Sequence, residues 1–66
     1  MSQLESEATA LKSVLMALPD SVERTIALRA IRHALSLLSR DVLSAADAYY
    51  RAKNFYERAQ KVRRSA

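Results

Sequence analysis

The chain lacks cysteine and glycine and has a single proline, Pro19, in 66 residues. Without cysteine, no disulfide can stabilise so short a chain, and with His33 as the only histidine no metal site is expected. Glycine and proline interrupt helices, so their near absence favours helix almost everywhere. No apolar run approaches the roughly 18 residues that span a bilayer. These absences predict an all-α protein without disulfide, metal or membrane span.

Residues that would support catalysis are also missing. His33 is expected on an outer helical surface beside Arg29, Arg32 and Arg40, as a lone surface histidine. Ser36 and Asp41 do not stand at spacings by which a helix would bring a nucleophile, a base and an orienting acid together. We therefore expect no catalytic residue, no cofactor and no enzymatic activity.

The first ten residues, MSQLESEATA, are polar and acidic and do not resemble a signal or transit peptide. The absence of cysteine fits a reducing compartment, so we expect a cytoplasmic protein. At this length, folding buries only about 60% of the surface that the unfolded chain exposes. A core this thin favours association with a second chain.

A first helix is predicted from about residue 2 to about residue 17. Ser2 and Glu5 have the spacing of a capping box, in which each side chain binds the other residue's amide. Pro19 ends this helix, because a proline biases the residue before it away from helical geometry.

A second helix is predicted to begin near residue 20, after a turn at residues 18–20. Asp20, with Glu23 three residues on, repeats the capping pattern. From there apolar residues recur at alternating spacings of three and four, as the a and d positions of heptads do. These positions are Leu28, Ile31, Leu35, Leu38, Val42, Ala45, Tyr49, Ala52, Tyr56 and Ala59.

The heptad phase passes unchanged through residues 39–41, which favours one unbroken helix from about residue 20 to about residue 64. Such a helix would be on the order of 65 Å long and could not bury its own apolar side. The expected architecture is therefore a single domain, residues 1–66, that forms a dimeric coiled coil or helix bundle. The competing interpretation breaks the chain at Ser39 or Asp41 and folds it back as a helical hairpin.

Charge and aromatic side chains both concentrate towards the end of the chain. Residues 1–23 carry a net charge of −3, whereas residues 51–66 carry +5. All four aromatic side chains lie in the stretch YYRAKNFYERAQKVRR. Most of these fall on the heptad seam, which argues against stacking on unpaired bases, because stacking requires exposed rings. Tyr50 is the exception and, with Leu43 and Leu37, is expected to form a separate apolar patch.

These patterns predict a protein that binds another protein as a small regulator, inhibitor or adaptor, and that self-associates as a homodimer. The residues expected to carry self-association are Leu28, Ile31, Leu35, Leu38, Val42, Tyr49 and Tyr56. Contact with the partner is assigned to Tyr50, Arg51 and Arg58, because tyrosine and arginine are enriched at interface hot spots.

Three other interpretations remain. The first is a nucleic-acid-binding dimer that contacts phosphates through its basic end, Arg58, Lys61, Arg63 and Arg64. The second is a structural component that assembles head to tail through its acidic and basic ends. The third is a helix-turn-helix around the sequence LPDS, which is weaker because that turn contains no glycine.

Overall fold

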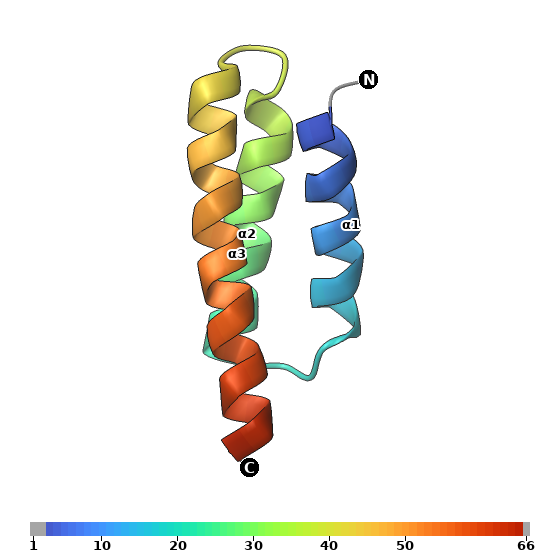
Figure 1. Cartoon of the computed structure of the whole chain (residues 1–66), viewed down its shortest axis with the longest axis vertical. Coiled ribbons are helices and arrows are strands. Elements are labelled where there is room, and N and C mark those ends of the chain that lie inside the picture. Colours follow the sequence, from blue (N-terminus) through green and yellow to red (C-terminus); the bar gives the residue numbers. More distant parts are fainter. Residues whose placement is uncertain (1–2, 66) are drawn as a thin grey trace.

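The computed structural model describes the backbone of residues 3–65 and the side chains of residues 3–61. Over this range it contains three helices, α1 (Gln3–Ala17), α2 (Val22–Leu37) and α3 (Val42–Ser65), and no strand. The predicted all-α fold class is confirmed. The helices lie side by side with alternating direction, and α2 and α3 form a close pair (Figure 1). No helix in the described part of the chain is both long enough and apolar enough to span a bilayer.

For the single chain, the prediction of one unbroken helix from residue 20 to residue 64 is wrong, and the chain forms the hairpin. Helix α2 ends at Leu37 and α3 begins at Val42, so the longest dimension of the molecule is 39 Å. The reason is burial: an isolated rod leaves its apolar seam in water, whereas a hairpin packs the two halves of the seam against each other. This gain outweighs the helical hydrogen bonds that the turn gives up.

The side chain of Arg24 connects α1 and α2 at the turn between them. Ser21, with extended backbone (φ −162°, ψ 164°), is the N-cap of α2, and its Oγ accepts from the Arg24 amide at 3.0 Å. The prediction that Asp20 is this cap is wrong, because its carboxylate instead pairs with the Arg24 guanidinium. Arg24 Nε also donates to the carbonyl of Leu15 at 2.8 Å. That oxygen belongs to the last turn of α1 and also accepts from the Leu18 amide at 3.2 Å, so the Arg24 side chain ties the end of α1 to α2.

The turn between α2 and α3 begins as a continuation of the helix. The amides of Arg40 and Asp41 both donate to the carbonyl of Leu37, at 2.9 and 2.7 Å, and Leu38 retains helical dihedral angles (φ −55°, ψ −36°). Asp41 then caps α3: its Oδ1 accepts from the Ser44 amide at 3.2 Å and its Oδ2 from the Ser44 hydroxyl at 2.7 Å. Within the described residues no φ is positive, so this turn requires no glycine.

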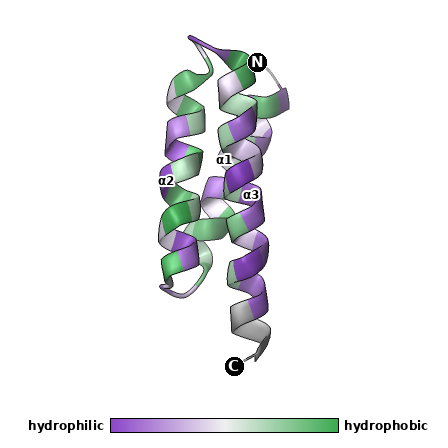
Figure 2. Ribbon diagram, turned by 90° about the vertical axis from the view of Figure 1, so that its left-hand side faces the viewer, coloured by the Kyte–Doolittle hydropathy of each residue, from purple (hydrophilic) through white to green (hydrophobic). Residues whose placement is uncertain are grey.

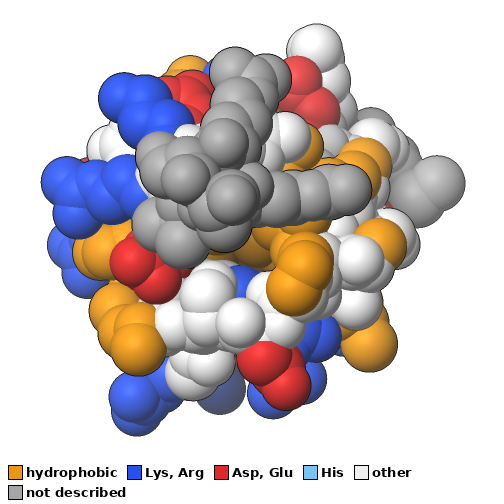
Figure 3. Space-filling model, turned by 90° about the horizontal axis from the view of Figure 1, so that it is seen from below, with side chains coloured by type: hydrophobic (Ala, Val, Ile, Leu, Met, Phe, Trp, Pro, Cys, Tyr) orange, Lys and Arg blue, Asp and Glu red, His pale blue; other side chains and the backbone are white. Residues whose placement is uncertain are grey.

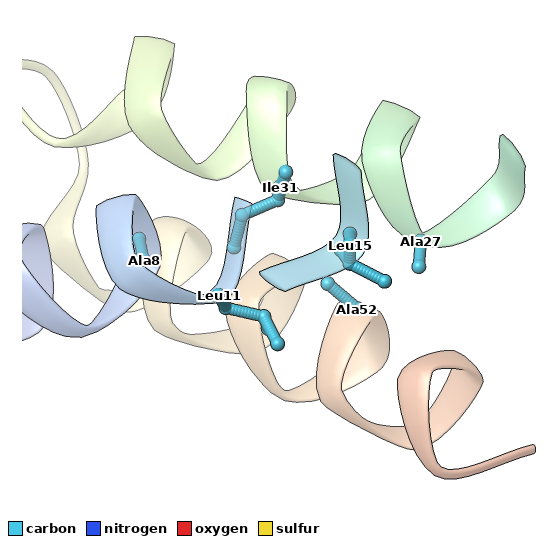
Figure 4. Close-up of a cluster of buried hydrophobic side chains, with 6 residues drawn as sticks. All are labelled: Ala8, Leu11, Leu15, Ala27, Ile31 and Ala52. Carbon is cyan, nitrogen blue, oxygen red and sulfur yellow. The ribbon is translucent and has the colours of Figure 1, made fainter. Parts of the chain in front are cut away.

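The core is rich in alanine and draws on all the described helices (Figure 4). Leu15 and Ile31 are the largest fully buried side chains. In its described part, α3 buries only alanines, and such small side chains let its backbone approach its neighbours closely. The central cluster consists of Ala8, Leu11, Leu15, Ala27, Ile31 and Ala52. The capping box predicted at Ser2 lies outside the described residues.

The Asp41 cap predicts a specific loss of stability in acid. Its hydrogen bonds from Ser44, that from the hydroxyl first and that from the amide second, hold the pKa of the Asp41 carboxyl below its ordinary value. A carboxyl that is more acidic in the folded chain stabilises the fold above its unfolded pKa, and this contribution disappears as pH falls through the folded pKa. We expect Asp41→Ala to lower the melting temperature at neutral pH and to differ progressively less from the wild type towards about pH 2.

Thermal melts followed by circular dichroism test this expectation. Asp47→Ala, in the second turn of α3, serves as a control for the removal of one carboxylate from the same helix. A deficit for Asp41→Ala that stays constant over the whole pH range would exclude the cap as its cause.

Candidate protein-interaction surface

The side of α3 that faces away from the core carries large apolar and cationic side chains. Leu43 is 84% exposed, although leucine is usually buried, and Tyr50 is 61% exposed. Residues three and four apart share one side of a helix, so these two align with the exposed arginines further along α3. We define the outer face of α3 as Leu43, Asp47, Tyr50, Arg51, Asn54, Arg58 and Lys61, all of which are exposed.

Contacts along the helix position the side chains of the outer face. The Tyr50 ring meets the half-buried Tyr49 ring edge to face, with centroids 5.6 Å apart and planes at 63°. Arg51 Nη2 lies 3.4 Å from Oδ2 of Asp47, which precedes it by four residues. Both members are exposed, so the ion pair orients Arg51 more than it stabilises the fold.

Arg58 is held in a different way. Its guanidinium carbon lies 4.9 Å from the centre of the Phe55 ring, and Phe55 is half-buried and packs against the core. A cation–π contact at such an exposed site contributes about 0.5–1 kcal/mol. The arginine is therefore anchored at its planar group while its edge remains available to an acceptor on another molecule.

The predicted self-association residues lie mostly between the helices of one chain. Ile31 is fully buried, and four others pack half-buried against the core: Leu28, Leu35, Tyr49 and Tyr56. Leu38 is also half-buried. Val42 differs, because it holds a seam position yet is 59% exposed. Self-association itself stays a prediction, and within the monomer this seam already has a partner.

The end of α3 continues past the turn between α1 and α2 (Figure 1), and the described residues that lead up to it are mostly hydrophilic (Figure 2). Arg58 and Lys61 are exposed there, and no ion pair joins Lys61 to Glu57 among the described side chains, although their spacing of four would allow one. Arg63 and Arg64 belong to α3, but their side chains lie outside the described residues. Seen from this end, both cationic and acidic groups are visible at the rim, with most of the cationic groups at the left and bottom of the view (Figure 3).

Other chemical roles find little support in the geometry. Among the described residues, no group of three histidine or acidic side chains could hold a metal ion. His33 is exposed, and its carbonyl accepts from the Ser36 hydroxyl at 2.8 Å. The helices run antiparallel (Figure 1), whereas the two helices of a DNA-binding helix-turn-helix meet at about 90–120°.

The expected patch of Leu37, Leu43 and Tyr50 is found only in part, because Leu37 is half-buried at the end of α2. Sequence reasoning missed the role of Arg24. The available signal was the Asp20 to Arg24 spacing of four, which favours an ion pair when both lie near a helix start.

A comparison with protein-family models, curated proteins and solved structures finds no match to this chain. The candidate surface is therefore defined by the exposure and chemistry of its own side chains. Leu43 and Tyr50 supply apolar area, and Arg51 and Arg58 supply oriented donors.

The contrast between the outer face and the core can be measured. We expect Leu43→Ser to leave the free energy of unfolding within about 0.5 kcal/mol of the wild type, because Leu43 makes little contact with the fold. Ile31→Ala should cost about 2–5 kcal/mol, because it leaves a cavity at a fully buried position. Urea denaturation of both variants makes the comparison. A destabilisation by Leu43→Ser as large as that by Ile31→Ala would mean that the outer face is part of the core.

Proposed function

We propose that the protein is a non-catalytic helical module that binds another protein, as a small regulator, inhibitor or adaptor, through the outer face of α3. The observation that supports this most is the exposure of Leu43 and Tyr50 on a helix whose opposite side already supplies the core. Scattered exposed apolar residues need no explanation, but here a leucine and a tyrosine share one side of a helix with two oriented arginines. Aromatic and arginine side chains are the usual anchors of protein interfaces.

The chemistry of the outer face also indicates the kind of partner. The apolar pair lies near the start of α3, and the cations Arg51, Arg58 and Lys61 follow towards its end, with Asp47 as the one acidic member of the face. A complementary surface has an apolar pocket bordered by carboxylates. Opposite charges at the edge of such an interface raise the association rate and fix the orientation.

Photo-crosslinking tests the proposed contact. With a photoreactive phenylalanine in place of Tyr50, we expect a defined crosslinked product in extracts of cells that express the protein. Leu43→Glu should reduce that product at least tenfold, because it places a charge in the apolar contact. The same photoreactive residue at Ser36, exposed on α2, is the matched control. Identical products from positions 50 and 36, or no effect of Leu43→Glu, would rule out the outer face as the contact.

Self-association as a homodimer is the second part of the proposal. It is supported by the heptad positions in α2 and α3 and by the exposure of Val42, a seam residue that the monomer leaves in water. The other seam residues are already in use within one chain, so a helical homodimer must draw on them in a different way.

Nucleic-acid binding is the alternative, favoured by the exposed Arg58 and Lys61 at the projecting end of α3. It predicts saturable binding to a labelled duplex that weakens steeply with salt. Replacement of Arg58, Lys61, Arg63 and Arg64 by glutamine should then flatten the slope of log K against log salt by about 0.9 for each phosphate that is no longer neutralised.

Fluorescence anisotropy at low and physiological salt measures this slope. Gln replacement of Arg29 and Arg32, both exposed on α2, is a control that removes charge elsewhere. A slope unchanged by the four replacements in α3, or an equal effect of the control, would rule out the basic end as a phosphate-binding site.

A further inference from the structure

We propose that two copies of this chain exchange α3: the turn at residues 38–41 straightens, α2 and α3 become one helix, and each α3 packs on the α1–α2 unit of the other copy. The inference rests on the self-association in the proposed function and is independent of the contact through the outer face. The surface of each α1–α2 unit that α3 leaves is covered by the α3 of a second copy of the chain. The turn between α2 and α3 is the first support.

This turn is close to helical and lacks the residues that enforce a break. The Asp41 amide donates to the carbonyl of Leu37 at 2.7 Å, which is the i to i−4 pattern of an α-helix, and the Ala45 amide donates to the carbonyl of Asp41 at 2.9 Å in the same pattern. Helical hydrogen bonds therefore join the Asp41 amide to the end of α2 and the Asp41 carbonyl to the start of α3. Neither glycine nor proline lies in this turn, and no positive φ occurs among the described residues, so a change of few dihedral angles makes the helix continuous.

The seam residues keep their phase through the turn. Leu38, Val42 and Ala45 follow one another at spacings of four and three, the same alternation as on either side. In a straight helix they extend the apolar stripe without interruption. A hairpin does not require this continuity, because the apolar residues of its turn do not have to lie on the same side as those of both helices.

Val42 is a seam residue that the hairpin leaves exposed to water. It is 59% exposed and Leu38 is half-buried, although both occupy seam positions. In an exchanged dimer with antiparallel helices, the former turns of the two copies meet at the centre, and these side chains of one copy face those of the other. The exchanged dimer therefore repeats the contacts of the monomer and adds new apolar burial, which is why exchange is a low-cost route to a dimer.

The part that moves is α3, and α1 stays with α2. Arg24 ties α1 to α2 through the carbonyl of Leu15, and α1 has its main contacts with α2 rather than with α3 (Figure 1). Ala52 is the member of the central cluster that comes from α3 (Figure 4). In the dimer, the α3 of the second copy supplies this alanine to an otherwise intact α1–α2 unit.

Two variants bias the turn in opposite directions. Asp41→Ala removes the α3 cap that holds the hairpin but fits a continuous helix well, so it should tighten the dimer about tenfold. Val42→Pro fits the first position of α3 but interrupts both helices of an exchanged dimer, so it should weaken the dimer by about 10⁴-fold. Val42→Ala, which removes most of the side chain but keeps the helix, should weaken it far less.

Mass and intrachain distance are measured together. Light scattering over a concentration series gives the mass against 7.4 kDa for one chain. Spin labels on Thr25→Cys and Asn54→Cys, in a chain with no native cysteine and diluted with unlabelled protein, report the distance within one copy. These two positions are twelve residues from either side of the turn, so they are neighbours in the hairpin and about 44 Å apart in a straight helix.

A dimer with the long distance, strengthened by Asp41→Ala and abolished by Val42→Pro, is the expected result. A dimer with only the short distance would overturn the exchange and leave self-association standing. Wild-type and Asp41→Ala chains that both remain monomeric would overturn exchange and self-association alike, without bearing on the contact through the outer face. Far-ultraviolet circular dichroism of Val42→Pro verifies that its helices form, and the Asp41→Ala result stands independently if they do not.

Discussion

The apolar seam between residues 28 and 59 must be buried, and within this chain its α2 half packs against its α3 half. Ile31 on α2 is fully buried and packs in the cluster that contains Ala52 of α3, with Leu11 and Leu15 of α1 completing the contact. No disulfide is available to stabilise the fold, and the described residues offer no metal site, so hydrophobic burial is its main support. The two turns and the placement of α1 all serve this burial.

Helix α3 has two sides with different roles. Its fully buried positions towards the core are alanines, which allow close packing, and the half-buried rings of Tyr49, Phe55 and Tyr56 pack against the core beside them. Away from the core it presents Leu43, Tyr50 and oriented arginines, which contribute little to the fold. Because stability depends on one side only, the other can vary in sequence without unfolding the protein. This separation suits an interaction module, in which the contact surface must be free to match its partner.

In the proposed exchange, the turn between α2 and α3 is the point at which the hairpin and the continuous helix would compete. Asp41 stabilises the hairpin by capping α3, whereas the uninterrupted heptad phase and the helical bonds around Asp41 suit a single helix. The Asp41 side chain thus favours the hairpin, whereas an apolar pattern over several turns of helix favours the continuous helix. The monomer forms the cap and leaves Val42 in water, and the exchanged dimer that we propose would do the reverse.

Local chemistry by itself determined the helical composition, the end of α1 before Pro19, the seam positions and the placement of Leu43 and Tyr50 away from them. Each of these depends on residues within one or two turns of helix, which is the range over which a sequence pattern acts directly. Only the tertiary structure decided that the seam closes within one chain, because rod and hairpin share the same local preferences and differ in long-range burial. The same holds for the corner: Ser21 rather than Asp20 became the cap of α2 because folding brought Arg24 to the end of α1, where it engages Asp20 and the Leu15 carbonyl together.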